Sequence, residues 1–305
     1  MERLLVLGID TVAGANLAES LSERCAVLGL YGNSSIVPSG IQGEVHGDDP
    51  ATVDALARAW QPRWIVACGA FSAAAWDETA PPTSNELAMV KSLTATAQEL
   101  SASLTVISSD VVFAGPRMFH DESSPPASPA TRARHVLAVE HATKGAASLV
   151  VRTHVYGWSP ASECTSFAER AYQAIVDGPS VAADGQRHAT PILAADLAPL
   201  LVRAFELRLA GLYHLSGAER TSPHRFASEL AAACGGRWDD RSRAAEPREA
   251  WLEETSLSSK RARRALKMPT PLLREGLARF VAQDAAPAHD HGHKAKRREA
   301  HELAA

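Results

Sequence analysis

Short, wholly apolar runs alternate with longer amphipathic segments along the first half of the chain. Runs of Val, Ile and Leu without polar alternation are typical of strands buried on both faces of a sheet. They predict strands at 3–8, 25–30, 64–68, 104–108 and 148–152. Apolar residues at helical spacing predict helices between them, at 15–23, 53–60, 85–100 and 131–144. Strands alternating with helices of this length indicate a doubly wound, Rossmann-like α/β fold with a parallel sheet.

After residue 155 the alternation is less regular. Helices are predicted at 167–176, 194–206, 223–234 and 271–283, with one short strand at 212–215. We therefore predict a Rossmann-like, dinucleotide-binding type of domain over 1–155 and a smaller α/β substrate lobe over 156–283. Residues 284–305 contain His, Lys and Arg but few large apolar residues, so we expect a disordered tail.

The composition narrows the classes of partner. Of the 305 residues, 46% are hydrophobic and 22% are charged, and the formal net charge is −4. This is enough apolar material for a large core, and it argues against nucleic-acid binding through overall basicity. No apolar run approaches the roughly 20 residues that span a bilayer. The first ten residues, MERLLVLGID, predict a strand rather than a signal peptide. We expect a cytoplasmic protein with no nucleic-acid or membrane partner.

The sequence predicts no metal site. Its cysteines are far apart and form no CxxC pair, so we interpret them as buried thiols: Cys25, Cys68, Cys164 and Cys234. Four histidines in the tail could chelate a metal, but a flexible segment offers no preformed geometry; they are His289, His291, His293 and His301. The basic cluster at 260–264 is interpreted as the solvated face of a helix.

A glycine-containing turn joins the first strand to the first helix. In doubly wound proteins this turn and the helix N-terminus bind the pyrophosphate of a dinucleotide. Gly8 and Gly14 are present, but Thr11, followed by Val12, takes the place of the middle glycine of a GxxGxxG pattern. Thr11 would crowd a phosphate, and Asp10 would repel it. The second strand ends in LYGNSS, without an acid for ribose hydroxyls. The turn is equally consistent with an NAD(P) site and with a structural corner.

Five further segments follow one another in an order shared with a known family. They are 108–115 (SSDVVFAG), 122–140 (Glu, then a Pro pair, ending in Glu), 151–157 (VRTHVYG), 190–198 (TPILAADLA) and 211–227 (GLYHLSG, ending in FA). With the first turn, these segments resemble the dTDP-4-dehydrorhamnose reductase (RmlD-like) family of extended short-chain dehydrogenases, over about residues 3–283. The resemblance implies NAD(P)-dependent reduction of a 4-keto sugar nucleotide, and two lobes that interleave along the chain.

The resemblance also implies where the reacting groups belong. In the family a Ser or Thr orients the carbonyl, a Tyr protonates the forming alkoxide, and a Lys four residues later lowers the pKa of that Tyr. These positions fall on Ser109, Arg132 and Val136. Arginine stays protonated and valine is apolar, so neither replaces the lost pair. His135 and His141 are proton donors by type, but helical rotation turns His141 away from Arg132 and leaves His135 only marginally placed.

Residues on the family's substrate side complete the expected site. Arg152, Arg187 and His188, with Gln186, would suit a diphosphate, although ordinary surface polarity explains them equally well. We predict a divergent, sugar-nucleotide-binding protein that has lost the standard reductase step and whose binding of NAD(P) is doubtful. Two alternatives stay open: an active NAD(P)-dependent reductase or epimerase with another proton donor, and a partner-binding regulatory subunit with no small ligand. The sequence does not decide between a monomer and a homodimer.

Overall fold

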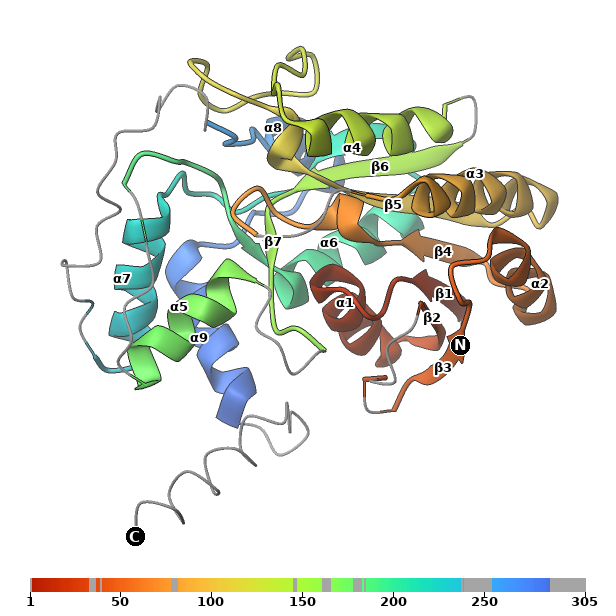
Figure 1. Ribbon diagram of the computed structural model, residues 1–305, viewed down its shortest axis with the longest axis horizontal. Helices are drawn as coiled ribbons and strands as arrows, with labels where there is room; N and C mark the ends of the chain where they lie inside the picture. Colours follow the sequence, from red (N-terminus) through yellow and green to blue (C-terminus); the bar gives the residue numbers. More distant parts are fainter. Residues whose placement is uncertain are drawn as a thin grey trace, which may run out of the picture.

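A seven-stranded parallel sheet forms the centre of the protein. The computed structural model describes residues 2–32, 37–38, 40–77, 82–144, 147–160, 166–177, 183, 185–236, 238 and 254–285. The strand order is β3-β2-β1-β4-β5-β6-β9 (Figure 1). These strands are β1 (Glu2–Leu7), β2 (Cys25–Tyr31), β3 (Gln42–Val45), β4 (Trp64–Ala67), β5 (Ser103–Ser109), β6 (Ser148–Thr153) and β9 (Gly211–His214). Every pairing is parallel, so the prediction of a doubly wound, Rossmann-like sheet is confirmed.

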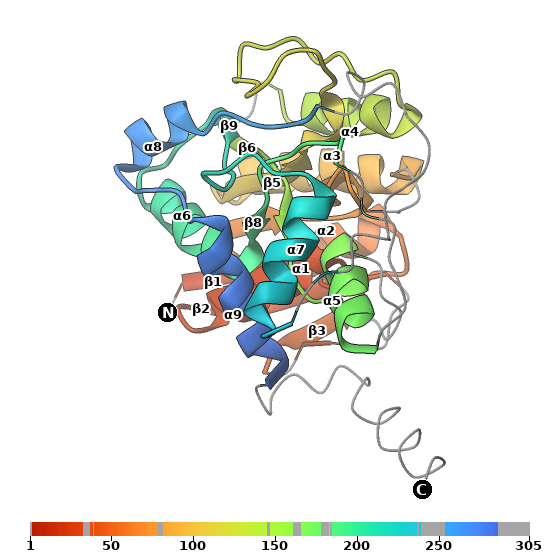
Figure 2. The ribbon, with the colours of Figure 1, turned by 90° about the vertical axis from the view of Figure 1, so that its left-hand side faces the viewer.

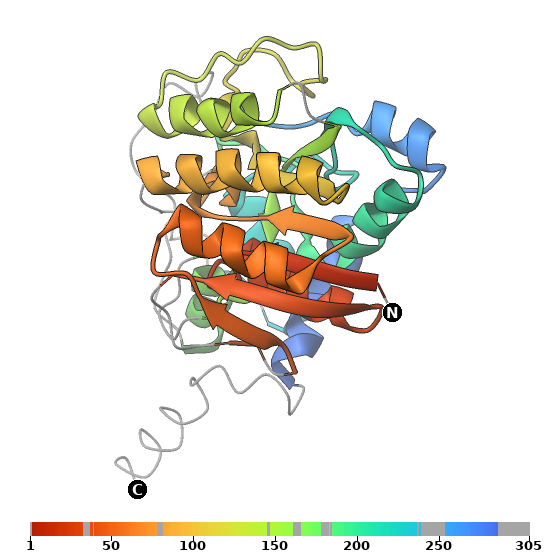
Figure 3. The same ribbon diagram turned by 90° about the vertical axis from the view of Figure 1, so that its right-hand side faces the viewer.

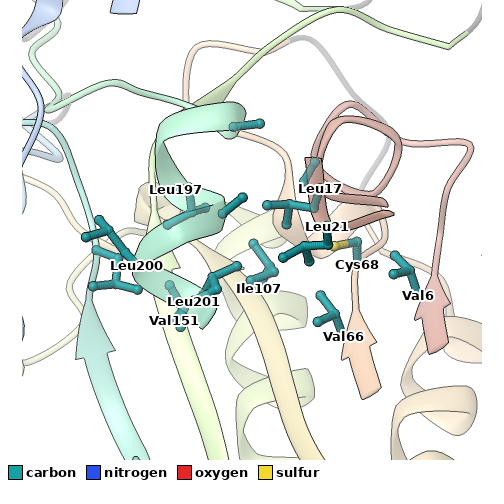
Figure 4. Packing of buried hydrophobic residues seen from close by; sticks show 14 of the residues in the cluster. Val6, Leu17, Leu21, Val66, Cys68, Ile107, Val151, Leu197, Leu200 and Leu201 are labelled. Carbon is teal, nitrogen blue, oxygen red and sulfur yellow. The ribbon is translucent and has the colours of Figure 1, made fainter. Parts of the chain in front are cut away.

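Helices cover both faces of this sheet. On one face lie α2 (Pro50–Trp60), α3 (Ser84–Glu99) and α4 (Thr131–Ala142), side by side (Figure 3). On the other face lie α1 (Val12–Ser22), α6 (Ala194–Glu206) and α8 (Lys260–Leu266). Figure 4 shows the core on this second face, where leucines of α1 and α6 meet strand residues: Leu17, Leu21, Leu197, Leu200 and Leu201 over Val6, Val66, Ile107 and Val151. Burial of these large side chains is the main stabilising contribution of the layer.

A smaller lobe packs beside the carboxyl ends of the strands. It contains α5 (Phe167–Asp177), α7 (Pro223–Ala233) and α9 (Leu273–Ala285), with a two-stranded sheet of β7 (Val155–Tyr156) and β8 (Ile192–Leu193) (Figure 2). Its core is aromatic. Trp158 stacks on Phe280 at a centroid distance of 4.3 Å. Trp76, from the loop after β4, enters the same core, 5.5 Å from Phe167 and 5.9 Å from Phe226.

The strands differ from the sequence-based expectation in two ways: β9 joins a different sheet, and β3, β7 and β8 are not predicted. The strand expected at 212–215 is β9, which pairs with β6 in the main sheet although we had placed it in the lobe; α6 likewise packs on the main sheet. The chain therefore returns to the main sheet after residue 155. The sequence did not predict this return, because a local pattern does not specify which sheet a strand joins. β3 was not predicted, since its sequence QGEV carries one apolar residue and lies at a largely exposed edge.

The remaining expectations concern single residues and the tail. Cys25 and Cys68 are buried free thiols and Cys234 is half-buried. The cationic residues at 260–264 lie in a helix, α8, with their charges exposed, as expected. α9 continues to Ala285, two residues beyond the end we predicted. Cys164 and the tail from residue 286 onward lie outside the described residues. Among the described helices, none is long and apolar enough to cross a membrane.

Candidate functional site

The turn between β1 and α1 is closed by two glycines. Gly8 has φ +80°, and a Cβ at this position would lie 2.4 Å from the carbonyl oxygen of Cys68, at the end of β4. A Cβ on Gly14 would lie 2.0 Å from the carbonyl oxygen of Gly8. Only glycine permits such close approach of backbone to backbone. The turn thus has the tight strand-to-helix geometry of a dinucleotide turn, and packing alone is enough to require both glycines.

Thr11 caps the helix that follows. Its Oγ1 accepts a hydrogen bond from the Gly14 amide at 3.1 Å and donates one to the Gly8 carbonyl at 2.7 Å. Val12 is the first residue of α1. A threonine cap stabilises a helix start by satisfying one of its free amides. That amide is one of the donors an anionic ligand would use at a helix N-terminus. Thr11 therefore occupies part of the anion-binding capacity of this turn with its own side chain.

Carboxylates gather around the same edge of the sheet. Asp10 Oδ2 accepts a hydrogen bond from the Gly32 amide at 2.9 Å and so connects the turn to the end of β2. A Cβ on Gly32 would lie 3.1 Å from Asp48 Oδ1 and 3.4 Å from Asp10 Oδ2. Burial, with the charges of Asp48 and Asp10 adding to it, raises the pKa of Glu86. A pyrophosphate entering here would meet like charge, so these residues do not suit a dinucleotide.

Asp48 and Glu86 were not among our predicted site residues. Asp48 lies between β3 and α2, and Glu86 lies in the first turn of α3, where it accepts hydrogen bonds from the amides of Ala70 and Thr83 at 2.6 and 2.8 Å. Glu86 also completes a capping box with Thr83, and that motif is readable from the sequence as a helix start. Its approach to the turn after β1 depends on the fold and has no local signal.

Ser109 and Arg132 meet on one backbone carbonyl. Ser109 ends β5 and is fully buried; its Oγ donates to the carbonyl oxygen of Ala73 at 2.6 Å. Arg132, in the first turn of α4, donates through Nη2 to the same oxygen. The guanidinium also donates to the carbonyl oxygens of Ala74 at 3.1 Å and Asp77 at 3.2 Å. Arg132, which we expect to take the position of the family's tyrosine, therefore clamps the 73–77 loop.

The electrostatics of Arg132 follow from its partly buried position. Burial lowers the pKa of its guanidinium, and the carboxylates of Asp77 and Asp110 oppose this shift. Burial raises the pKa of Asp77, whose carboxylate accepts hydrogen bonds from the amides of Phe167 and Ala74. An arginine remains protonated in such surroundings, because its ordinary pKa is far above neutrality. Arg132 can hold the loop and offset buried negative charge, but it cannot deliver a proton to an alkoxide.

Val136, which we expect to take the position of the family's lysine, lies one helical turn after Arg132. It is fully buried in the core cluster between the sheet and the helices α2, α3 and α4. It offers a methyl surface and no charge. His135 and His141 are both exposed on α4. The predicted outward position of His141 is confirmed, and His135 does not reach the buried site either.

A buried His154–Asp110 pair lies beside Ser109 and was not predicted. His154 follows β6, whose Thr153 is in register with Ser109. Its Nδ1 lies 2.7 Å from Asp110 Oδ2, and its ring meets the edge of Trp76 at a centroid distance of 4.5 Å. Asp110 also accepts a hydrogen bond from the amide of Ala75 at 3.0 Å. The signal was available, because the carboxyl ends of neighbouring parallel strands bring the SSD and RTH segments together.

The expected substrate-side residues lie in two different settings. Arg152 is buried and makes two hydrogen bonds to Glu140, at 2.8 and 2.7 Å, so a core ion pair accounts for it and we no longer expect it to bind substrate. Arg187 and His188 are half-buried. The carbonyl oxygen of His188 accepts a hydrogen bond from the Thr255 amide at 2.9 Å, and Thr255 Oγ1 donates to Asp110 at 2.5 Å. His188 is thus connected to the site through Thr255.

No metal site emerges from this arrangement. Among the residues that the structure describes, no group of three or more His, Cys, Asp or Glu side chains is arranged to hold a metal ion. The carboxylates near the turn instead accept hydrogen bonds from backbone amides, as with Asp10 and Gly32.

Comparison with solved structures identifies the fold. The dTDP-4-dehydrorhamnose reductase from Bacillus anthracis str. Ames, in complex with NADP, superposes with a TM-score of 0.73 at 20% identity, covering 92% of this chain and 99% of that chain. The Bordetella bronchiseptica enzyme WbmH, in complex with NAD+, gives 0.75 at 17%, covering 94% and 100%. The UDP-N-acetylglucosamine 4-epimerase from Bacillus cereus gives 0.73 at 14%, covering 94% and 100%. At these identities the likeness concerns the fold alone.

Family membership rests on a separate comparison. A search of curated proteins gave no match. The model of the RmlD substrate binding domain family matches residues 1–286, a range that includes every residue the structure describes. The order of motifs read from the sequence, the doubly wound sheet and this match agree, and the chain belongs to the RmlD family.

Proposed function

We propose that this chain is a non-reducing member of the RmlD family, which binds a sugar nucleotide or acts as a regulatory protein without the standard hydride-transfer step. The observation that carries the proposal is the shared carbonyl of Ala73. Ser109 and Arg132, at two of the three family positions that handle the substrate carbonyl, both donate to this backbone oxygen. Groups that serve a reduction would instead be directed at the reacting oxygen of a ligand.

The proton requirement of the reaction supports this proposal. Hydride transfer to a ketone leaves an alkoxide that must receive a proton from a positioned acid. Arg132 stays protonated, and Val136 is apolar. Two other tyrosines have their contacts elsewhere: Tyr172 donates its hydroxyl hydrogen to Asp284 at 2.8 Å, and the ring of Tyr156 packs in the lobe core, 5.1 Å from that of Phe226. Neither is positioned by these contacts to replace the lost phenol.

The cofactor side of the site supports the proposal independently. Thr11 uses the Gly14 amide, and Asp10, Asp48 and Glu86 place negative charge around the turn where a pyrophosphate would lie. We therefore propose that NAD(P) is not a working cofactor of this chain. The buried polar groups beside Ser109, namely Asp110, His154 and Thr255, together with the lobe beside them, favour retention of a small-molecule site.

The decisive experiment separates cofactor binding from ligand binding. NADH and NADPH are titrated into the protein while nicotinamide fluorescence is followed, with the Bacillus anthracis reductase as the positive control. Isothermal titration with dTDP-glucose and UDP-N-acetylglucosamine follows. We expect no saturable nicotinamide signal and a measurable heat with at least one sugar nucleotide. Micromolar binding of NADPH would contradict the loss of the cofactor.

A second candidate function is favoured by the His154–Asp110 pair. A histidine held by a buried carboxylate is a common acid–base arrangement, so an active reductase or epimerase could take its proton from His154 instead of a tyrosine. The test is turnover of a 4-keto sugar nucleotide. Turnover that is lost in both Ser109→Ala and His154→Gln, but kept in His135→Gln, would establish this alternative over the first proposal.

A further inference from the structure

α8 presents a fully cationic outer face. Its apolar residues Ala262 and Leu266 are buried against the main core, whereas its charged residues are exposed. At 3.6 residues per turn, these charges fall on the arc opposite the two buried residues. We call this set the α8 cations: Lys260, Arg261, Arg263, Arg264 and Lys267.

The α8 cations have no carboxylate partner among the residues that the structure describes. Within the part of the chain that the structure describes, no Asp or Glu oxygen lies within 4.0 Å of their charged nitrogens. Arg261 instead lies over the ring of Tyr213, 4.4 Å from its centroid. Several other exposed arginines are paired, for example Arg58 with Glu99 at 3.0 Å. A chain of formal net charge −4 thus concentrates four like charges on one short helix and a fifth at its C-cap, Lys267, which costs repulsion that an anionic partner would relieve.

An exposed apolar tip lies next to this helix. Met118 is 56% exposed and Phe119 is 45% exposed. Phe119 has φ +52°, an uncommon conformation for an aromatic residue, and one that persists only when the surroundings impose it. Its amide donates to Ser256 Oγ at 2.8 Å. The two side chains are therefore held out into solvent on a fixed support.

The support of the tip leads directly into α8. The amide of His120 donates to the Ser256 carbonyl, and the amide of Ser258 donates to the His120 carbonyl, each at 2.8 Å. Ser258 precedes Lys260 by two residues, which is at most about 7 Å of chain. Figure 2 shows the segment that enters α8 passing beneath the loop between β5 and α4, which carries the tip. The apolar pair and the cations are thus neighbours on one part of the surface.

We propose that Met118, Phe119 and the α8 cations form a docking surface for an acidic, leucine-containing segment of a partner protein. Methionine adapts to varied apolar side chains, an exposed aromatic is a typical anchor, and arginine pairs well with carboxylates. An anionic membrane fits less well, because a charged plane would also face the net negative remainder of the molecule. A peptide segment contacts only the local patch, and beyond about 8 Å salt screens the rest.

The test uses a fluorescein-labelled peptide of repeated Glu-Glu-Leu-Leu units and the full chain, followed by fluorescence anisotropy. The cationic variant is Arg263→Gln with Arg264→Gln, and its matched control is Arg3→Gln with Arg24→Gln, two exposed arginines at the other end of the sheet. The apolar variant is Met118→Ser with Phe119→Asn, since asparagine tolerates positive φ. Its control is Leu272→Ser, at a position that is 50% exposed.

We expect saturable binding that each test variant weakens by about five-fold or more, with controls within about two-fold, and weaker binding between about 50 and 300 mM salt. Absence of saturable binding by the unaltered protein, or equal affinities in test and control variants, would overturn the proposal. So would α8-dependent sedimentation with phosphatidylserine vesicles without peptide binding. A dimer in analytical ultracentrifugation that only the test variants dissociate would assign the surface to a second copy and also overturn it.

Discussion

Ser109 Oγ and Arg132 Nη2 donate hydrogen bonds to the same carbonyl oxygen, that of Ala73. One residue comes from the end of β5 and the other from the first turn of α4, so the shared acceptor ties a strand, a helix and the loop after β4 together. In a reductase of this fold the corresponding groups serve a ligand. Here both groups bind the backbone of the protein. Removing either of them should therefore lower the free energy of unfolding.

Removing the Arg132 side chain should destabilise the fold. Arg132→Ala would remove the guanidinium donor from the carbonyls of Ala73, Ala74 and Asp77, although Ser109 Oγ still donates to the first and the Asp77 amide to the second. We expect a loss of about 1–3 kcal/mol in the free energy of unfolding. The matched control is Arg134→Ala on the exposed side of the same helix, which should change it by less than about 0.5 kcal/mol. Urea denaturation measures both, and equal losses would show that the clamp has no special weight.

Breaking the Arg152–Glu140 pair should be more costly. Arg152→Met leaves the Glu140 carboxylate buried with only the Ser108 hydroxyl as a side-chain partner, at 2.6 Å, and we expect a loss of about 3–5 kcal/mol. Adding Glu140→Gln removes the charge and keeps an acceptor for Ser108, so the double variant should regain much of the stability. Urea denaturation of the two variants provides the comparison. A double variant as unstable as the single one would argue against an uncompensated charge.

Glu169 should make the protein less stable as the pH rises. Burial raises the pKa of this carboxyl from 4.5 to about 7, while its oxygens accept hydrogen bonds from Ser159 and Ser166. The folded chain therefore holds more protons than the unfolded chain between these pKa values. The stabilisation is complete below about pH 4.5 and is lost as the pH rises through about 7, by up to about 3 kcal/mol.

The measurement is the free energy of unfolding of the unaltered protein and of Glu169→Gln across that pH window. Glutamine keeps an acceptor for Ser159 but does not titrate, so its profile should lack this fall. Glu206→Gln, at an exposed pair with Arg203, serves as the control and should follow the unaltered protein. Parallel profiles for all three proteins would show that Glu169 is ionised in the folded chain.

His214 should act in the opposite direction. Burial lowers its pKa from 6.5 to about 3, and the nearby Arg152 charge adds to the shift. The unfolded chain binds a proton in this window and the folded chain does not. Stability is therefore complete above about pH 6.5 and falls as the pH drops toward 3, by at most about 1.4 kcal/mol for each pH unit.

Asparagine can replace the contact that His214 makes. Nδ1 lies 2.9 Å from the His120 carbonyl, and the amide nitrogen of His214→Asn occupies a comparable position without titrating. We expect the acid sensitivity measured by circular dichroism to decrease in this variant. His224→Asn, on the first turn of α7, is the control. If both variants unfold at the same pH as the unaltered protein, another group governs acid unfolding.

Much of the architecture could be predicted because the buried strands of the core are rich in apolar residues. β1, β4 and β6 are apolar on both faces, and the intervening helices have a clear period, so the parallel sheet followed directly. β3 escaped because an exposed edge strand needs no apolar run. β9 was found as a strand but placed in the wrong layer, since its partner β6 is distant in sequence.

The site could be predicted only at positions where the resemblance to the family says which residue to expect and this sequence has a different one. Arg132 and Val136 could be recognised as losses, and the structure supplies the contacts that each makes instead. Glu86 and Trp76 reach the site from segments whose local sequence does not point to it, since the capping box of Glu86 indicates only a helix start, so only the fold brings them there. His154 and Asp110 lie between these cases, because the neighbouring strand ends were both identified and their juxtaposition could have been inferred.

The segment that leads into α8 also supplies hydrogen-bond partners late in synthesis to residues made much earlier. Thr255 bonds to Asp110, Ser256 to the Phe119 amide and Ser259 to Ser216, so parts made early in synthesis wait for a contribution made near the end. A chain whose synthesis has not reached this segment lacks the Thr255 donor to Asp110 and the Ser256 acceptor for the Phe119 amide. The polar groups beside Ser109 therefore gain this partner only after residue 255 has been made.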